Sequence, residues 1–240
     1  KKVRFAAGPR RSKYMVVGSV LEKADARTEV WGAGFIASDS EVVQNPKEVH
    51  AVRGPLTRER LLGLGVEAPE VYGDPALLFP LFYTPEVRKS YRLGIVPHYT
   101  DKCHPWLNTV AQREDVKIID IEGGIYRVVD EVNSCETVVS SSLHGIICAD
   151  AYGIPSGWIK LGDELEGDDF KFFDYHASVG VSRPEALQVA DGTEVESLIA
   201  HTTRPAMDID LRRLFEACPF LDEGVEEQAL DDHSSYVYTP

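Results

Sequence analysis

One segment, residues 136–159, constrains the fold more than any other part of the chain. It reads ETVVSSSLHGIICADAYGIPSGWI. The β-branched run predicts a buried strand, and the three serines with the Leu-His-Gly that follows predict a turn. The apolar run from Ile146 then predicts a helix, which ends near Gly153, and a further strand begins at Trp158. This order of elements is typical of a parallel α/β sheet.

The turn in this segment also carries a chemical signal. In a parallel α/β sheet, ligands bind outside the carboxyl ends of the strands, where the next helix presents N–H groups. Ser140–Ser142 and His144 would lie at such a place. Hydroxyl and N–H donors beside an imidazole suit an anionic substrate that must also be protonated. The alternative is structural, with serines that only cap the helix.

Apolar strands followed by glycine or proline turns recur along the chain. We predict strands near residues 14–17, 29–37, 49–52, 71–72, 91–96, 116–121 and 158–161, with helices between several of them. The alternation predicts an α/β protein with two Rossmann-like, parallel-sheet domains. We place the N-terminal domain at 1–85, the C-terminal domain at 86–207, and a C-terminal helix with an acidic tail at 208–240.

Charge and cysteine content narrow the class of protein. A net charge of −14 argues against a general nucleic-acid binder, which would carry a basic face. It also makes an arginine beside a turn informative, because an anionic substrate needs local positive potential in an acidic protein. The four cysteines are irregularly spaced, which predicts free thiols in a reducing compartment. No apolar run approaches the ~20 residues of a membrane span, and we expect a cytoplasmic protein.

Two further side chains follow predicted strands. Arg53 comes after the strand at 49–52 and before Gly54-Pro55, which begins a helix, so both guanidinium and helix terminus favour an anion. Arg58 and Thr57 lie within a turn of the same terminus and could assist. The alternative for Arg53 is a salt bridge to a neighbouring acid.

His98 follows the strand at 91–96 and is a candidate for proton transfer or phosphate contact. The alternative is a histidine in a surface loop. Cys103 and His104 lie nearby, yet no second ligand pair follows at a suitable spacing, so we predict no metal site here.

Three segments resemble the polysaccharide pyruvyltransferase family. The first is Ser141–Gly145 with Ala149–Pro155, the second is Val52–Pro55 leading to Gly73–Leu78, and the third is Gly94–Tyr99. Together they cover roughly residues 14 to 180 in the order typical of the family. Such enzymes move pyruvate from phosphoenolpyruvate onto a sugar of a bacterial exopolysaccharide or cell-wall glycan as a ketal. Their fold is similar to that of two-domain GT-B glycosyltransferases, and they carry more sequence before this point, so we expect an incomplete N-terminal domain.

The resemblance implies roles for individual residues. It makes His144 and His98 catalytic candidates. The run at 171–175 also resembles the family. There Lys171 would contact phosphate, and Asp174 would orient a base or a sugar hydroxyl. The alternative is that the aromatic residues of this run lie in the core and its charged side chains are solvated. The implied substrate-binding residues are Arg53, Arg58, Ser141, Ser142, Leu143, Gly145, Lys171 and Asp174.

The resemblance also implies partners. The donor would be phosphoenolpyruvate, and no metal or cofactor would be needed. The acceptor would be a sugar, such as that of a lipid-linked oligosaccharide. The protein would reach it at the inner face of the plasma membrane, with at most peripheral membrane contact. Two alternatives stay open: a sugar-nucleotide-dependent GT-B glycosyltransferase, and an inactive glycan-binding module. The latter predicts exposed aromatic platforms, whereas Trp31, Trp106 and Trp158 are scattered along the sequence.

Overall fold

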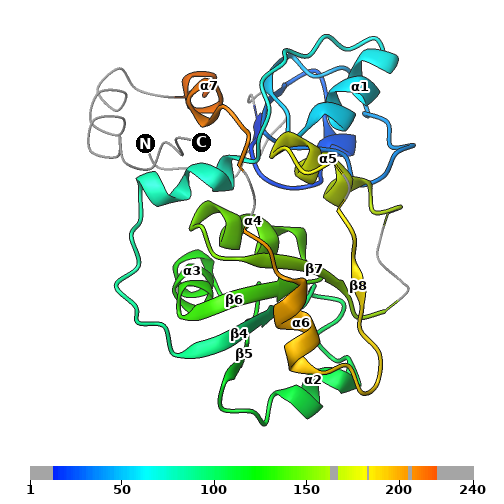
Figure 1. Cartoon of the computed structure of the whole chain (residues 1–240). Helices are drawn as coiled ribbons and strands as arrows, with labels where there is room; N and C mark the ends of the chain where they lie inside the picture. The colour runs from blue at the N-terminus through cyan, green and yellow to red at the C-terminus, as the bar shows by residue number, and fades with distance from the viewer. Residues whose placement is uncertain (1–12, 163–166, 183, 205–206, 221–240) are drawn as a thin grey trace. The chain divides into compact units, whose positions relative to one another are not determined.

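The structure is a computed structural model that describes residues 13–162, 167–182, 184–204 and 207–220 of the chain (Figure 1). The basic segment 1–12 and the acidic tail from residue 221 lie outside the described residues. The described residues form two compact units. Unit 1 contains residues 13–75, 167–180 and 208–220, and unit 2 contains residues 76–162, 181–182, 184–204 and 207.

The units are not contiguous in sequence, unlike the predicted domains. Unit 1 gives way to unit 2 after Pro75, at the start of the 3₁₀ helix η2 (Pro75–Leu81). The chain then returns to unit 1 for helix α5 (Phe170–Ser178), although these residues fall within the predicted range 86–207.

Unit 2 is built on a five-stranded parallel sheet in the order β5-β4-β6-β7-β8. Its strands are β4 (Tyr91–Val96), β5 (Val116–Ile118), β6 (Cys135–Ser140), β7 (Ser156–Lys160) and β8 (Leu187–Gln188). Its helices are α2 (Pro105–Val110), α3 (Ile125–Asn133), α4 (Leu143–Ala151) and α6 (Val195–His201). The sequence-based prediction of a parallel α/β sheet is therefore confirmed for this unit.

Helices cover both faces of this sheet. Successive side chains of a strand point to opposite faces, so one strand contributes to two cores. On β4, Leu93 and Ile95 join a core with residues of α2 and α6. Val96, on the other face, joins a second core with residues of α3 and α4. The strands are accordingly rich in buried apolar residues on both sides, as a covered parallel sheet requires.

The strand order defines a topological switch point. From β4 the chain moves outward to β5, and then returns past β4 to β6 and continues in the opposite direction to β7 and β8. The loops after β4 and β6 therefore diverge, although the two strands are neighbours paired from Tyr91↔Cys135 to Val96↔Ser140. In open α/β sheets, ligands bind at the carboxyl ends of the strands at such a point.

Unit 1 contains a three-stranded parallel sheet in the order β1-β2-β3. The strands are β1 (Lys13–Met15), β2 (Thr28–Trp31) and β3 (Glu48–Ala51). The helices are η1 (Leu21–Lys23), α1 (Pro55–Gly63), α5 and α7 (Leu211–Glu216). Bridges at Ser19↔Gly34 and Val52↔Tyr72 extend the parallel pairing, and the core includes Phe35, Leu61 and Phe170.

One predicted boundary is wrong. Helix α4 begins at Leu143 rather than Ile146, so Leu143, His144 and Gly145 form its first turn instead of a preceding loop. The close approach of α4 to the sheet explains this start. A side chain on Gly145 would overlap Ser140 Oγ and would lie 2.8 Å from Val96 Cβ, so only glycine lets the helix begin directly at the end of β6.

No helix in the described part of the chain is both long enough and apolar enough to cross a bilayer.

Candidate active site

His98 and Ser141 meet at the switch point of unit 2. His98 follows β4 and Ser141 follows β6, and the His98 backbone N–H donates to Ser141 Oγ at 2.9 Å. Ser141 Oγ in turn donates to Asp101 Oδ2 at 2.6 Å, and Ser141 N–H donates to the Val96 carbonyl at 3.2 Å. Two loops that diverge from neighbouring strands are thus joined through one serine hydroxyl.

The other two serines shape the turn itself. Ser140 Oγ contacts the Val96 carbonyl at 2.8 Å and the Ser142 carbonyl at 2.6 Å, and it accepts from the Ser142 N–H at 2.9 Å. Ser142 is the extended N-cap residue of α4, but its side chain makes no capping hydrogen bond. Ser140 therefore determines the turn, and the proposed alternative, in which the serines serve as side-chain caps, does not hold for Ser142.

His144 lies in the first turn of α4, one residue after Leu143, and is partly buried. The first N–H groups of a helix carry a partial positive charge, so an anion at this terminus is stabilised. Leu143 and Gly145 on either side are buried, which fixes the backbone that carries the imidazole. The site therefore combines a helix amino terminus, hydroxyl groups and two imidazoles within unit 2.

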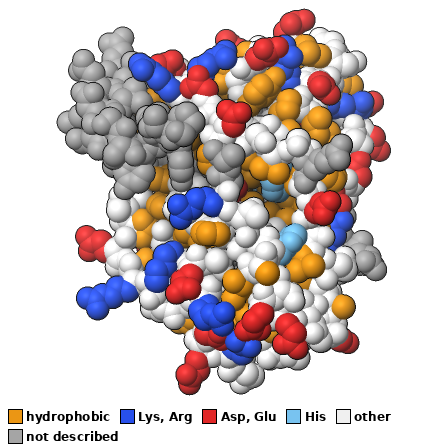
Figure 2. Space-filling view, viewed as in Figure 1, with side chains coloured by type: hydrophobic (Ala, Val, Ile, Leu, Met, Phe, Trp, Pro, Cys, Tyr) orange, Lys and Arg blue, Asp and Glu red, His pale blue; other side chains and the backbone are white. Residues whose placement is uncertain are grey.

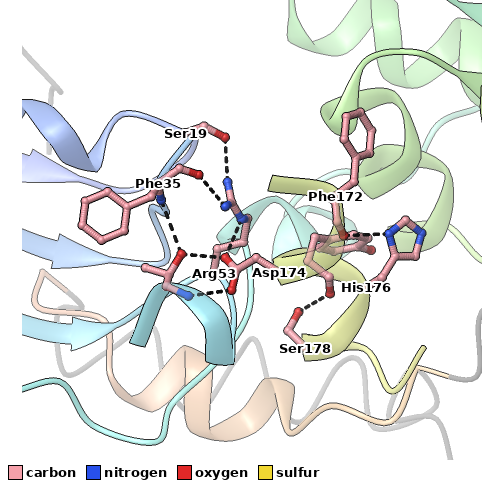
Figure 3. A network of polar contacts seen from close by, with 9 residues as sticks. Ser19, Phe35, Arg53, Phe172, Asp174, His176 and Ser178 are labelled. Atoms are coloured by element: carbon pink, nitrogen blue, oxygen red, sulfur yellow. Dashed lines mark hydrogen bonds and ion pairs between the residues drawn. The ribbon is translucent and has the colours of Figure 1, made fainter. Parts of the chain in front are cut away.

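In unit 1, Arg53 is fully buried, and its guanidinium points toward Ser19, Phe35 and Asp174 (Figure 3). Its Nε donates to Asp174 Oδ2 at 2.9 Å, Nη1 to Ser19 Oγ at 2.6 Å, and Nη2 to the Phe35 carbonyl at 2.7 Å. Three of the five guanidinium donors thus bind groups of unit 1. The geometry supports an organising role; direct contact of Arg53 with a substrate stays a prediction.

Asp174 is equally buried and binds the start of α1. Its Oδ1 accepts from the Thr57 N–H at 2.9 Å, and its Oδ2 accepts from Thr57 Oγ1 at 2.7 Å as well as from Arg53. The carboxylate therefore occupies the amino terminus of α1, which sequence reasoning had assigned to an anion. Here the anion is a side chain of α5, so the salt-bridge alternative for Arg53 is the one that the structure shows.

Two glycines make room for this network. A Cβ on Gly34 would lie 2.6 Å from the guanidinium carbon of Arg53, and one on Gly54 would overlap the Asp174 carbonyl oxygen. Both backbone segments approach the ion pair more closely than a side chain permits.

The remaining predicted residues lie in separate surroundings. Lys171 is buried on α5, with its Nζ 5.6 Å from the centre of the Phe172 ring. Arg58 donates to the Ala68 carbonyl at 3.0 Å and pairs with Glu70 at 3.4 Å. These roles of Lys171 and Arg58 in substrate binding stay predictions.

Charge and aromatic side chains bear on the alternative functions. Figure 2 shows basic and acidic side chains interspersed over the visible face of the molecule. All three tryptophans, Trp31, Trp106 and Trp158, are buried, so none of them is an exposed platform for a glycan.

Among the described residues, the one group of acids and histidines close enough to share a metal ion is Glu29, Glu48 and His50. It does not include His98, Cys103 or His104. Lys47 pairs with Glu29 at 2.5 Å and lowers the pKa of this carboxyl, and the ammonium charge of Lys47 opposes a second cation there.

Three side chains that complete these networks were not predicted: Thr100, Asp101 and Ser19. Thr100 and Asp101 could have been found, because they lie two and three residues after His98 in a polar loop at the end of a strand. Ser19 follows the first strand in the same way. Thr57 was expected to assist at the amino terminus of α1, but its partner Asp174 could not be predicted, since it lies 117 residues away.

Comparison with known proteins decides the family. A model of the polysaccharide pyruvyl transferase family matches residues 7–162. The chain belongs to the polysaccharide pyruvyl transferase family. The matched residues include β4, β6 and the start of α4, which build the switch-point site, as well as Arg53.

Two relatives place this family member among known sequences. The uncharacterized protein L143 of Acanthamoeba polyphaga mimivirus is 34% identical over 178 residues, which cover 72% of this chain and 62% of the relative. The succinoglycan biosynthesis protein ExoV of Rhizobium meliloti (strain 1021) is 30% identical over 207 residues, which cover 82% of this chain and 62% of the relative. The chain thus spans less than two thirds of the length of either relative.

Proposed function

We propose that this chain transfers pyruvate from phosphoenolpyruvate to two hydroxyls of one sugar, in an exopolysaccharide or its lipid-linked precursor. The product is a pyruvate ketal, and phosphate is released. The observation that carries the proposal is the grouping of His98, Ser141 and the His144 turn of α4 at the switch point of unit 2, in a member of this family. A GT-B-like pairing of two such α/β units is part of the same proposal.

The reaction balances without an external acid or base. Two C–O bonds form to the sugar oxygens, one C–H bond forms at the methylene carbon, and the C–O bond to phosphate breaks. Of the two hydroxyl protons, one reaches the methylene carbon and the other leaves with phosphate. The protein must therefore take protons from hydroxyls and deliver one to carbon, which imidazoles can do near neutral pH.

The residues of unit 2 suit these steps. The amino terminus of α4 attracts the phosphate or carboxylate of the donor, and the hydroxyls of the serine turn add donors. His144, in the first turn of that helix, contacts the phosphate or protonates the methylene carbon. The scheme assigns no step to a cofactor.

The test is incubation with phosphoenolpyruvate and a panel of glycosides, with phosphate release and ketal formation as readouts. His144→Ala should lose well over tenfold in kcat/KM, which is more than about 1.4 kcal/mol of transition-state stabilisation. His50→Gln is the matched control, because this imidazole lies on β3 and contacts Glu29. Full activity in His144→Ala would remove His144 from the mechanism.

A thermal-shift screen tests the donor separately. Phosphoenolpyruvate should raise the melting temperature, and the shift should grow with the logarithm of its concentration above Kd, since it binds the folded state. Stabilisation by uridine or guanosine diphosphate with none by phosphoenolpyruvate would instead favour a sugar-nucleotide glycosyltransferase and overturn the proposal.

A further inference from the structure

A short relay of polar groups surrounds His98 in the loop after β4. Thr100 Oγ1 lies 2.7 Å from His98 Nδ1 and 3.3 Å from Asp101 Oδ1. The other oxygen of Asp101, Oδ2, accepts from Ser141 Oγ at 2.6 Å. Asp101 N–H also donates to the His98 carbonyl at 2.8 Å, which closes the loop into a tight turn.

Counting protons fixes the direction of this relay. The His98 backbone N–H can only donate, so Ser141 Oγ accepts it and gives its own proton to Asp101. A carboxylate oxygen accepts, so Thr100 directs its single proton to Asp101 Oδ1. Thr100 Oγ1 then acts as acceptor toward His98, and His98 Nδ1 must carry a proton.

The opposite arrangement is unfavourable. If Thr100 donated to Nδ1, its oxygen and Asp101 Oδ1 would be two acceptors facing each other at 3.3 Å. Hydrogen bonds to a carboxylate are stronger than neutral ones, which also favours donation to Asp101.

We propose that Asp101, acting through Thr100, holds the proton of His98 on Nδ1 and so makes Nε2 the basic atom of the ring. The assignment of roles rests on the proposed function. His98 is then the base that takes the acceptor hydroxyl proton at Nε2, and His144 acts on the donor substrate. Thr100 and Asp101 are positioning residues, comparable to the carboxylates that orient catalytic and metal-binding histidines elsewhere.

Other charges near the loop do not replace Asp101. Lys102 follows it directly and pairs with Asp120 and Glu122, from the segment after β5, at 2.5 Å each. On the β6 side the contacting group is the neutral Ser141, and the next titratable side chain along that segment is His144.

The tautomer can be measured without any assay of activity. Long-range ¹H–¹⁵N correlation spectra of the ¹⁵N-labelled full chain, assigned with His98→Gln, distinguish a ring protonated at Nδ1 from one protonated at Nε2. We expect Nδ1–H in the wild type. Thr100→Val should move the population toward Nε2–H, the form that prevails for the histidine side chain in water, and Thr100→Ser should restore the wild-type signal. Because Thr100 is exposed, these variants should fold.

Activity gives the second readout. Thr100→Val and Asp101→Asn should lower kcat by about tenfold or more at little cost in KM, because they alter a proton acceptor rather than binding. A wild-type ring protonated at Nε2, or a Thr100→Val chain with an unchanged tautomer, would overturn the relay. A wild type that releases no phosphate from phosphoenolpyruvate would overturn the proposed function, and the tautomer spectra would still decide the relay.

Discussion

Arg53 and Asp174 form a buried ion pair in which neither charge reaches solvent. Taking two charges out of water costs several kcal/mol per ion, so such a pair persists only with further hydrogen bonds. Thr57 supplies two of them to the carboxylate, and Ser19 and the Phe35 carbonyl accept one each from the guanidinium. The pair therefore organises the turns after β1 and β2 and the start of α1.

Removing one partner of this pair should be costly. We expect Asp174→Ala to lower the unfolding free energy of unit 1 by about 3–5 kcal/mol, because it leaves the Arg53 charge buried and uncompensated. The measurement is the hydrogen-exchange stability of the amides in α1.

The control is the exposed pair of Arg212 with Glu216, at 2.8 Å on α7 of the same unit. Glu216→Gln should leave the stability of α1 unchanged, since exposed ion pairs are screened by solvent. An Asp174→Ala chain as stable as Glu216→Gln would show that the buried pair has no structural role.

These residues also show how far sequence reasoning reaches. Arg53 could be singled out, because strand, Gly-Pro and helix follow one another locally. Its partner could not, because Asp174 lies 121 residues further along and only tertiary packing brings α5 to α1. The His98 and Ser141 contact is an intermediate case: each is visible as a residue at a strand end, but only the strand order makes the two strands neighbours.

At the scale of elements, glycines determine how closely helices approach one another and the sheet. Gly54, the N-cap of α1, faces the backbone of Asp174 on α5, whereas Gly63, at the other end of α1, has no heavy atom within 4 Å of a built Cβ. The same substitution at the two ends of one helix should therefore have opposite effects.

Gly54→Ala should destabilise unit 1 by about 1–3 kcal/mol, because the added methyl must push α5 away. Gly63→Ala should stabilise it by about 0.4–1 kcal/mol, since alanine loses less conformational entropy on folding. Urea unfolding of both variants checks the sign. Equal effects would mean that α5 does not sit against Gly54.

The boundaries of elements were harder to predict than their existence. The strand at 91–96 was predicted as it is found, and most other strands and the helices at α1 and α3 lie within a few residues of expectation. Helix α4 starts earlier than its apolar run suggested, because burial of Gly145 against Ser140 outweighs the polar character of Leu-His-Gly. The sequence did not predict that α5 is a helix, because its aromatic residues indicate burial in a core but not the type of secondary structure.

At the scale of the whole molecule, each unit has a hydrophobic core of its own, with two separate cores on the faces of the unit 2 sheet. Units with independent cores can open independently. None of the four cysteines forms a disulfide, and in unit 2 Cys135 is buried and Cys148 is partly buried. Burial raises the pKa of the Cys135 thiol to about 11 and that of Cys148 to about 12.

These thiols should report the opening of unit 2. Alkylation requires the thiolate, so at pH 8 iodoacetamide should modify the exposed Cys103 first and spare Cys135 and Cys148 until urea unfolds the unit. In Asp174→Ala, the urea midpoint for Cys148 labelling should stay at its wild-type value, because the substitution lies in unit 1. Peptide mass spectrometry measures both. Labelling of Cys148 as fast as Cys103 without urea would mean that the core of unit 2 is open in the native chain.

The separation of Arg53 from Asp174 has a consequence for synthesis on the ribosome. At about 5–20 residues per second, roughly 6–24 s pass between translation of the arginine and of the aspartate that neutralises it. During that interval four of the five strands of the unit 2 sheet, β4 to β7, are made, while the Arg53 guanidinium has no carboxylate partner. β8 and α6 of unit 2 then follow, and α7 of unit 1 is made after them. The part of the polypeptide that is made first is therefore expected to finish folding last.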